Sequence, residues 1–190
     1  MKLLVLDNYD SFTYNLVHMF RSMNIDHEVY RNDKISAEEA LSFDFIILSP
    51  GPGIPSEAGN MGKIIAACAG KKPILGICLG HQAIAEYLGA KLNNMSSVYH
   101  GVKNKINILS NEEIFEGIPE EIEVGRYHSW EVLREGLPEN ISVTAEDENG
   151  TIMALSDASK KMYGIQFHPE SVMTEYGEEM IQNFLKIAQS

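Results

Sequence analysis

The sequence predicts an α/β fold with an open, mostly parallel sheet that is flanked by helices and carries antiparallel strands at its edge. In the first half of the chain, entirely apolar segments such as residues 3–6 and 45–48 alternate with segments of helical periodicity. Strands without a polar face are typical of a parallel sheet that helices cover on both sides. In the second half, polar and apolar residues alternate along several segments, which is typical of antiparallel strands.

The first half is expected to alternate between strands and helices. The predicted strands are residues 3–6, 28–30, 45–48 and 74–77, and the predicted helices contain residues 12–20, 58–69 and 82–88. Asp10 or Ser11 can cap the first helix, because short polar side chains accept hydrogen bonds from free N–H groups there. Gly70 and Gly89 are expected to end the other two helices, since glycine readily adopts the left-handed conformation that follows a helix.

The second half is expected to add antiparallel strands, one central strand and a final helix. The alternating segments are residues 105–108, 121–127, 141–145 and 151–155. Residues 163–167 are apolar enough for a strand in the middle of the sheet, and residues 175–188 have helical periodicity. The sequence contains no repeat and no linker, so we expect a single domain over residues 1–190.

Composition and charge argue against several classes of protein. The formal net charge is −12 at pH 7 and is spread along the chain, which disfavours binding to nucleic acid or to an anionic membrane. The two cysteines, Cys68 and Cys78, lack the spacing of metal ligands, so we expect no metal site. The apolar run at residues 3–6 is too short for a signal peptide, and no segment reaches the roughly 20 apolar residues of a membrane span. The cytoplasm is therefore the expected location.

A cysteine at a predicted strand-to-helix turn is the strongest functional signal in the sequence. Residues 76–80 are Gly-Ile-Cys-Leu-Gly, between an apolar strand and a helix. A G-x-C-x-G turn of this kind presents a nucleophile on a tight elbow. The dipole and the free N–H groups of the helix N-terminus favour the thiolate of Cys78, and the N–H of Leu79 points to where an oxyanion would form.

A histidine and a glutamate near the C-terminus are candidates for the base and for the group that orients it. Residues 166–170 are Gln-Phe-His-Pro-Glu. Pro169 favours an extended backbone at His168, and residues two apart in an extended segment project to the same side. Glu170 can therefore hold the His168 imidazole, so that Cys78, His168 and Glu170 have the layout of a catalytic triad.

A rigid loop, residues 49–53 with the sequence Ser-Pro-Gly-Pro-Gly, follows another predicted strand. It lacks the Lys and Ser/Thr of a phosphate-binding P-loop. Its prolines restrict the backbone and its glycines leave N–H groups uncovered, so Gly53 is a candidate for a second oxyanion donor. Ligands of open parallel sheets bind beyond the carboxyl ends of the strands, so we expect this loop, residues 7–10, Cys78 and His168 to converge at one edge.

Four segments of the chain together resemble the class I, or triad-type, glutamine amidotransferases. Three are general to that family: residues 49–53, residues 76–82 (Gly-Ile-Cys-Leu-Gly-His-Gln) and residues 166–171 (Gln-Phe-His-Pro-Glu-Ser). The fourth, residues 7–15 (Asp-Asn-Tyr-Asp-Ser-Phe-Thr-Tyr-Asn), resembles the glutaminase subunits of anthranilate synthase and aminodeoxychorismate synthase. The resemblance covers essentially the whole chain and implies a flavodoxin-like fold.

The resemblance implies a glutaminase reaction and gives residues their roles. Cys78 would attack the side-chain amide of glutamine, His168 oriented by Glu170 would protonate the departing ammonia, and water would then cleave the γ-glutamyl thioester. The N–H groups of Gly53 and Leu79 would hold the oxyanion. The residues implied to bind glutamine are Gly51, Gly53, Gln82, Ser129 and Trp130.

Two positions depart from many members of the family. Trp130 stands where many have Leu, and Val102 stands where many have Lys. Neither position belongs to the triad, and both bear on the rim of the pocket and on partner contacts. Among the other histidines, His81 is expected to pack or cap in the turn after the nucleophile, while His100 and His128 lie in predicted loops that could line the pocket.

The resemblance also implies a protein partner, because free ammonia at neutral pH is mostly ammonium, which is not a nucleophile. The ammonia must pass by a protected path to a second active site, and the sequence contains no residues to spare for a chorismate-binding domain. We expect a separate synthase large subunit that binds chorismate and Mg²⁺, and no cofactor in this chain. Tyr9, Ser11 and Phe12, beside the predicted active edge, are the candidate docking residues.

Three alternatives stay open at the level of sequence. The synthase could make anthranilate, for tryptophan biosynthesis, or aminodeoxychorismate, for folate biosynthesis, or one subunit could serve both. A thiol peptidase or γ-glutamyl hydrolase would use the same elbow and triad, but residues 7–15 argue against it. A docking subunit that has lost catalysis would not need Cys78, His168 and Glu170, and all three are present.

Overall fold

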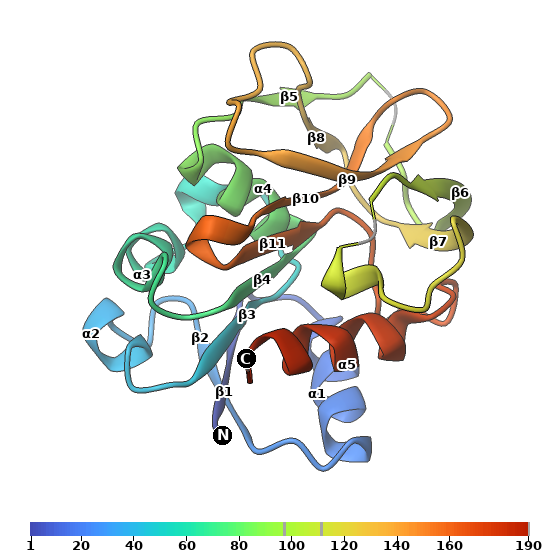
Figure 1. Cartoon of the computed structure of the whole chain (residues 1–190). Coiled ribbons are helices and arrows are strands. Elements are labelled where there is room, and N and C mark those ends of the chain that lie inside the picture. The colour runs from blue at the N-terminus through green and yellow to red at the C-terminus, as the bar shows by residue number, and fades with distance from the viewer. Residues whose placement is uncertain (97, 111, 190) are drawn as a thin grey trace.

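The computed structural model describes residues 1–96, 98–110 and 112–189. Within them, one sheet has nine strands in the order β2-β1-β3-β4-β11-β10-β9-β6-β7, and β5 and β8 form a separate small sheet (Figure 1). The strands are β1 (Leu3–Asp7), β2 (His27–Arg31), β3 (Phe45–Leu48), β4 (Ile74–Ile77), β5 (Leu92–Asn94), β6 (Val102–Ile108), β7 (Glu121–Arg126), β8 (Trp130–Val132), β9 (Ser142–Asp147), β10 (Ile152–Asp157) and β11 (Met162–Ile165). The α-helices are α1 (Thr13–Ser22), α2 (Ala37–Ala40), α3 (Met61–Cys68), α4 (Leu79–Tyr87) and α5 (Gly177–Ile187), and the 3₁₀ turns are η1 (Pro55–Glu57), η2 (Glu113–Phe115) and η3 (Ala158–Lys160).

The parallel half of the sheet consists of β2, β1, β3, β4 and β11. Successive side chains of a strand face opposite sides, and in β1 both sides are buried. Leu3 and Val5 join a core cluster with α1 and α5, whereas Leu4 and Leu6 join a second cluster with α3 and α4. Figure 1 accordingly has α1 and α5 on one side of the sheet and α2, α3 and α4 on the other. The predicted α/β architecture is confirmed.

The antiparallel half consists of β10, β9, β6 and β7. Strand β11 joins the two halves, because it pairs parallel with β4 and antiparallel with β10. The antiparallel strands lie at one end of the sheet order, as the alternating sequence pattern predicts. The small sheet of β5 and β8 lies beyond this half in Figure 1.

Several predicted boundaries are displaced for local reasons. The helix predicted at residues 82–88 begins earlier, at Leu79. The helix predicted at 58–69 is shortened to α3, and the 3₁₀ turn η1 precedes it. Neither Asp10 nor Ser11 is the N-cap of α1, because Asp10 Oδ1 accepts the N–H of Phe12 (2.7 Å) in a turn that precedes the helix. The predictions for Gly70 and Gly89 are confirmed, with φ angles of +71° and +101° directly after α3 and α4.

The strand predicted at residues 163–167 ends two residues early. Ile165 is the last residue of β11 that pairs with β4, and its partner Ile77 is the last residue of β4. The pairing with β4 therefore stops where β4 ends, while the Gln166 N–H still donates to the carbonyl of Met153 in β10 (2.9 Å). Strands β5 and β8 and helix α2 were not predicted, because three or four residues are too few to display a hydrophobic period.

Candidate active site

Cys78 lies at the junction of β4 and α4 in a backbone conformation that few residues other than glycine adopt. Its φ is +52° and its ψ is −99°. Strain of this kind persists only where the surroundings enforce it, and it is common at active sites. The Cys78 N–H donates to the carbonyl of Ile165 (2.9 Å), and the Cys78 carbonyl accepts from the N–H of Gln82 (3.0 Å). The thiol is thus presented from a fixed elbow.

Close approach of the backbone explains both glycines of the G-x-C-x-G pattern. A Cβ at Gly76 would lie 2.3 Å from the carbonyl carbon of Gly80. A Cβ at Gly80 would lie 2.5 Å from the carbonyl oxygen of Leu48 in β3. Neither contact can be relieved by rotating a side chain, because the atoms that would clash belong to the backbone. The elbow therefore forms only where β3, β4 and the first turn of α4 can pack without intervening side chains.

His168 and Glu170 are buried, and they interact as the sequence predicts. His168 Nδ1 donates to Glu170 Oε1 (2.7 Å), while His168 Nε2 has no hydrogen-bond partner among the described residues. Burial lowers the pKa of His168, but attraction to Cys78 and Glu170 outweighs burial and raises the pKa to about 10. The imidazole is consequently protonated at neutral pH, and its Nε2 proton is available for transfer.

Two aromatic rings fix the orientation of the His168 imidazole. The centroids of Phe12 and Tyr127 lie 4.8 and 4.9 Å from that of His168, both in edge-on geometry. Thr174 Oγ1 also donates to the His168 carbonyl (2.6 Å). Phe12, one of the predicted docking residues, therefore turns inward and packs on the histidine of the triad.

The Ser-Pro-Gly-Pro-Gly loop lies against the elbow. A Cβ at Gly51 would lie 2.7 Å from Leu79 Cδ2, so the loop touches the first residue of α4. Asn8 fixes the start of the loop, because its N–H donates to Ser49 Oγ (2.9 Å) and its Nδ2 donates to the Ser49 carbonyl (2.8 Å). The N–H of Leu79 has no acceptor within the helix that it begins. Gly53 is exposed with a φ of +74°, and its role as the second donor stays a prediction.

The site has the arrangement expected for nucleophilic acyl transfer. A thiol projects from a strained backbone, a carboxylate holds the imidazole, and N–H donors adjoin them. The family model for glutamine amidotransferase class-I matches residues 4–188. The chain belongs to the class-I glutamine amidotransferases.

Similar proteins match this amidotransferase over nearly its whole length. Anthranilate synthase component 2 of Pseudomonas aeruginosa is 44% identical over 191 residues, which cover 97% of this chain and 94% of the relative. Aminodeoxychorismate/anthranilate synthase component 2 of Bacillus subtilis is 44% identical over 186 residues, which cover 97% of this chain and 95% of the relative. The crystal structure of a glutamine amidotransferase from Thermotoga maritima has a TM-score of 0.79 over 100% of this chain and 99% of that one. At 15% identity it shows the shared fold.

The predicted glutamine-binding residues of the amidotransferase come from separate segments. Gln82, one turn after Cys78, donates from Nε2 to the Trp130 carbonyl (3.0 Å) and to Gln166 Oε1 (3.2 Å). Gln82 Oε1 accepts none of the hydrogen bonds found among the described residues, although the Gln82 side chain is buried. Ser129 and Trp130 are half-buried at the start of β8. The structure thus brings Gln82 and Trp130 together and leaves one acceptor, Gln82 Oε1, without a partner.

A buried ion pair in the amidotransferase was missed by the sequence analysis. Arg126 donates to Asp147 Oδ2 (2.6 Å), and both side chains are almost inaccessible to solvent. Arg126 also donates from Nε to His128 Nε2 (3.1 Å). The alternation along β7 contained the signal, since Ile122 and Val124 are buried at alternate positions and Arg126 continues that series.

His81 is the second residue after Leu79 in α4, and it is fully buried against β11. A Cβ at Gly164 would lie 2.7 Å from His81 Nδ1, which shows how closely the ring approaches that strand. Burial lowers the pKa of His81 to about 3, so the ring is neutral under ordinary conditions. His81 therefore packs beside the elbow, as expected, and does not supply charge to it.

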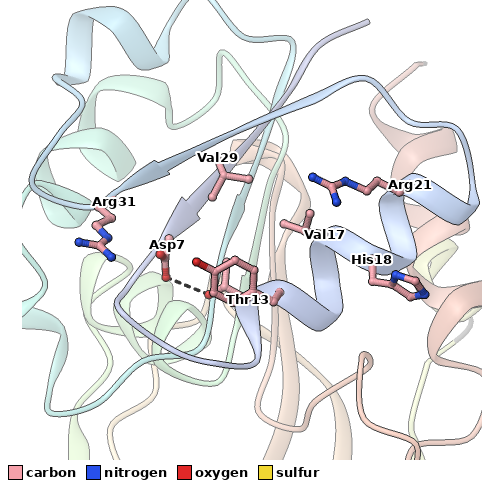
Figure 2. A pocket seen from close by; sticks show the side chains of 8 residues that line it. Asp7, Thr13, Val17, His18, Arg21, Val29 and Arg31 are labelled. Atoms are coloured by element: carbon pink, nitrogen blue, oxygen red, sulfur yellow. Dashed lines mark hydrogen bonds between the residues drawn. The ribbon is translucent and has the colours of Figure 1, made fainter.

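The predicted docking segment borders a cavity of about 550 Å³ between α1 and β2 (Figure 2). Tyr9 and Ser11 have exposed side chains. Arg21 and Arg31 line the cavity, and neither lies within ion-pair distance of a carboxylate among the described residues (Figure 2). No residue of the triad lines this cavity. The lining has two arginines against one carboxylate, that of Asp7, so we call this cavity the basic groove, and it is separate from the elbow.

Residues 1–96, 98–110 and 112–189 contain neither a cluster of metal ligands nor a membrane-spanning helix. No three His, Cys, Asp or Glu side chains in these ranges are arranged to hold a metal ion. None of the helices in these ranges has the length and apolar character needed to cross a membrane.

Proposed function

We propose that this chain is a glutaminase subunit that hydrolyses glutamine to glutamate and ammonia through a thioester on Cys78. The ammonia passes to a chorismate-using anthranilate synthase large subunit, in tryptophan biosynthesis. The observation that carries this proposal is the strained Cys78 elbow beside the His168–Glu170 pair. The names of the relatives from Pseudomonas aeruginosa and Bacillus subtilis support the choice of pathway.

The first half of the reaction forms the acyl-enzyme. The Cys78 thiolate attacks the side-chain carbonyl carbon of glutamine, and the resulting oxyanion accepts hydrogen bonds from the N–H groups of Leu79 and Gly53. When the carbon–nitrogen bond breaks, His168 Nε2 gives its proton to the departing nitrogen, which leaves as ammonia. The raised pKa of His168 supports this role, because the ring begins the reaction as an acid.

The second half releases glutamate. His168, now neutral, takes a proton from water as the water oxygen attacks the γ-glutamyl thioester. The carbon–sulfur bond breaks and Cys78 leaves as a thiolate, so the imidazolium and the thiolate are both restored. Glu170 stabilises the imidazolium in each step through its hydrogen bond to Nδ1 (2.7 Å).

The substrate's amino-acid end is placed by groups that the triad does not use. Gln82 Oε1 is an acceptor that no hydrogen bond among the described residues uses, which suits the ammonium group of glutamine. Backbone groups of Gly51, Ser129 and Trp130 complete the proposed glutamine site. The chain itself needs no cofactor for this reaction, and Mg²⁺ belongs to the partner's chorismate chemistry.

The proposed partner docks on the α1 side of the active edge, in a heteromeric complex in the cytoplasm. Tyr9, Tyr14 and Val172 expose apolar surface there, and Val172 follows Glu170 by two residues. The basic groove beside them fits an acidic segment of the large subunit, because Arg21 and Arg31 lack carboxylate partners in the described parts of the chain. Tyr9→Ala should weaken binding in titration calorimetry. Tyr87→Ala, an exposed tyrosine on α4, is the matched control and should bind normally.

Aminodeoxychorismate synthase is the second candidate partner, in folate biosynthesis. It is favoured by one observation, which is that the name of the Bacillus subtilis relative covers both syntheses. The glutaminase chemistry is the same in either case, so only the partner distinguishes the two functions.

The function is tested by measuring glutamate release from glutamine by the chain alone and with each purified large subunit. Cys78→Ala is the blank. Release that depends on Cys78 and rises with the anthranilate synthase subunit supports the proposal. Stimulation by the aminodeoxychorismate synthase subunit alone would replace the pathway, and no release under any condition would contradict the glutaminase function itself.

A further inference from the structure

A chain of buried polar groups runs from the antiparallel strands to the helix of the nucleophile. It links Asp147, Arg126, His128, the carbonyl of Trp130 and Gln82 through successive hydrogen bonds. We infer that Arg126 and His128 are positioning residues that hold the Ser129–Trp130 turn at a fixed place relative to α4 and so complete the glutamine site. Only the statement that the turn completes the glutamine site rests on the proposed function, because the hydrogen bond between His128 and Trp130 exists whatever the protein binds.

The ring of His128 has only one arrangement of protons that satisfies both neighbours. Its Nε2 accepts from Arg126 Nε (3.1 Å), so its Nδ1 carries the proton and donates to the Trp130 carbonyl (2.8 Å). Burial, and then the charge of Arg126, lower the pKa of His128 to about 4. The ring therefore stays neutral above that pH and keeps both hydrogen bonds.

Arg126 is anchored so firmly that it can serve as the fixed end of the chain of hydrogen bonds. Its guanidinium is paired with Asp147 Oδ2 (2.6 Å), and its central carbon lies 3.7 Å from the centroid of the Tyr99 ring. Asp147 Oδ1 is held in turn by the N–H groups of Asn149 and Thr151 (both 2.9 Å). Asp147 ends β9, Asn149 and Thr151 lie in the turn before β10, and Tyr99 precedes β6.

The Trp130 carbonyl accepts hydrogen bonds from two separate parts of the molecule. It accepts one hydrogen bond from His128, in the antiparallel half, and one from Gln82 Nε2 (3.0 Å), on α4. Two donors on one carbonyl fix the orientation of that peptide group. The Gln82 Nε2 donor is thereby used, and Oε1 is the atom of the amide that accepts no hydrogen bond among the described residues.

Loss of the His128 hydrogen bond should loosen the turn without disturbing the thiol. No hydrogen bond of the chain described above involves the side chains of Cys78, His168 or Glu170. The expected defect is thus in binding glutamine. A structural residue with no such role would instead change stability alone, or would change binding and thiol reactivity together.

The test compares His128→Phe with His128→Asn. Phenylalanine keeps a planar ring and removes both nitrogens, whereas the asparagine amide can place a donor near the former Nδ1. His27→Phe is the matched control, because His27 also donates from Nδ1 to a carbonyl, that of Ile25, at 2.8 Å, and lies in β2 away from the site. All three variants are made in the full chain and checked for thermal stability.

Two readouts decide the inference. Trp130 is the only tryptophan, so its fluorescence and its quenching by acrylamide report the turn directly. His128→Phe should increase quenching and raise KM for glutamine by about tenfold, with kcat and the rate of Cys78 alkylation by iodoacetamide close to those of the wild type. His128→Asn should recover part of both losses, and His27→Phe should change neither.

The contrary results are equally distinct. Unchanged tryptophan quenching and unchanged KM in His128→Phe would overturn the inference. An equal rise in KM in His27→Phe, or a parallel loss of iodoacetamide reactivity, would reduce His128 to a general structural role and overturn it too. If the wild type releases no glutamate, the proposed function fails, and the quenching comparison still decides whether His128 holds the turn.

Discussion

The parallel strands β1, β3 and β4 bury almost only apolar side chains, whereas the antiparallel strands β7 and β9 bury an arginine and an aspartate between them. The first region forms the elbow and ends next to the triad. The second holds the turn that contains Trp130 through Arg126 and His128. Different interactions therefore hold the two regions in place.

The difference follows from what each region has to fix. The elbow needs backbone segments packed closely around Cys78, and glycines with apolar neighbours provide that. The substrate turn needs one peptide carbonyl to point in a set direction, which apolar packing cannot specify and paired hydrogen bonds can. A polar network in the core is costly unless every group is satisfied, so it should be the more sensitive region to acid and to loss of one partner.

The largest effect is expected from a methyl group added in the parallel half. Gly76→Ala places a Cβ 2.3 Å from the backbone of Gly80, so it should cost about 4 kcal/mol or more of unfolding free energy, or prevent folding. Gly62→Ala in α3 is the control, because no atom lies within 4 Å of its Cβ, and it should stabilise by about 0.5–1 kcal/mol. Urea unfolding measures both. A Gly76→Ala protein as stable as the wild type would contradict the close packing of Gly76 against the backbone of Gly80.

In the antiparallel half, the corresponding destabilising substitution is Arg126→Met. It leaves the Asp147 carboxylate buried without its ionic partner and should destabilise the chain by about 3–5 kcal/mol. Adding Asp147→Asn removes the stranded charge, so the double variant should be more stable than the single one. A single variant within experimental error of the wild type in urea unfolding would show that the ion pair does not anchor this half.

The two regions also differ in how much of them could be predicted from the sequence. The strands at residues 45–48 and 74–77 match their predicted bounds, because a short apolar run is a local signal. The elbow and the His168–Glu170 pair were predicted from short motifs, and the structure has the two side chains in contact.

The Arg126 network could not be predicted in the same way. Its members come from β7, the turn after it and β9, and only the pairing of these strands with β6 brings Arg126 to Asp147. The alternation of Ile122, Val124 and Arg126 places the arginine on a buried face, but it does not say which acid it meets. The three-residue strand β8 adds no pattern that would identify the turn.

A smaller effect on stability is expected from the protonation of two buried histidines, His81 in α4 and His128 after β7. Burial lowers the pKa of His81 to about 3 and, with Arg126, that of His128 to about 4, while both would be about 6.5 in the unfolded chain. Below about pH 6.5 the unfolded state takes up these protons first, so stability is complete above that pH and falls on acidification. Each ring should cost on the order of 2 kcal/mol at pH 5.

Urea unfolding at pH 7 and pH 5 measures this loss. His168 acts in the opposite direction, because its raised pKa stabilises the folded chain fully below about pH 6.5, and this stabilisation declines as the pH rises from 6.5 toward 10. His128→Asn should reduce the difference between the two pH values, since it removes one of the protonating groups. An unchanged difference in that variant would show that His128 is not held neutral in the folded chain.

The smallest effect is expected from an exposed ion pair on the same strands that bury Arg126. Lys105 on β6 and Glu121 on β7 lie 2.7 Å apart with exposed side chains. Solvent and salt screen such a pair, so Lys105→Met should leave the unfolding free energy unchanged within error. A loss as large as that of Arg126→Met would mean that burial does not separate the two pairs.

The most direct measurement of the account is to trap the acyl-enzyme. The chain is mixed with ¹³C-labelled glutamine, quenched in acid during turnover and digested, and the peptide that contains Cys78 is examined by mass spectrometry. We expect a labelled γ-glutamyl group on Cys78 that is absent from Cys78→Ala. Glutamate release by Cys78→Ala at the rate of the wild type, with no adduct on Cys78 in either protein, would contradict it.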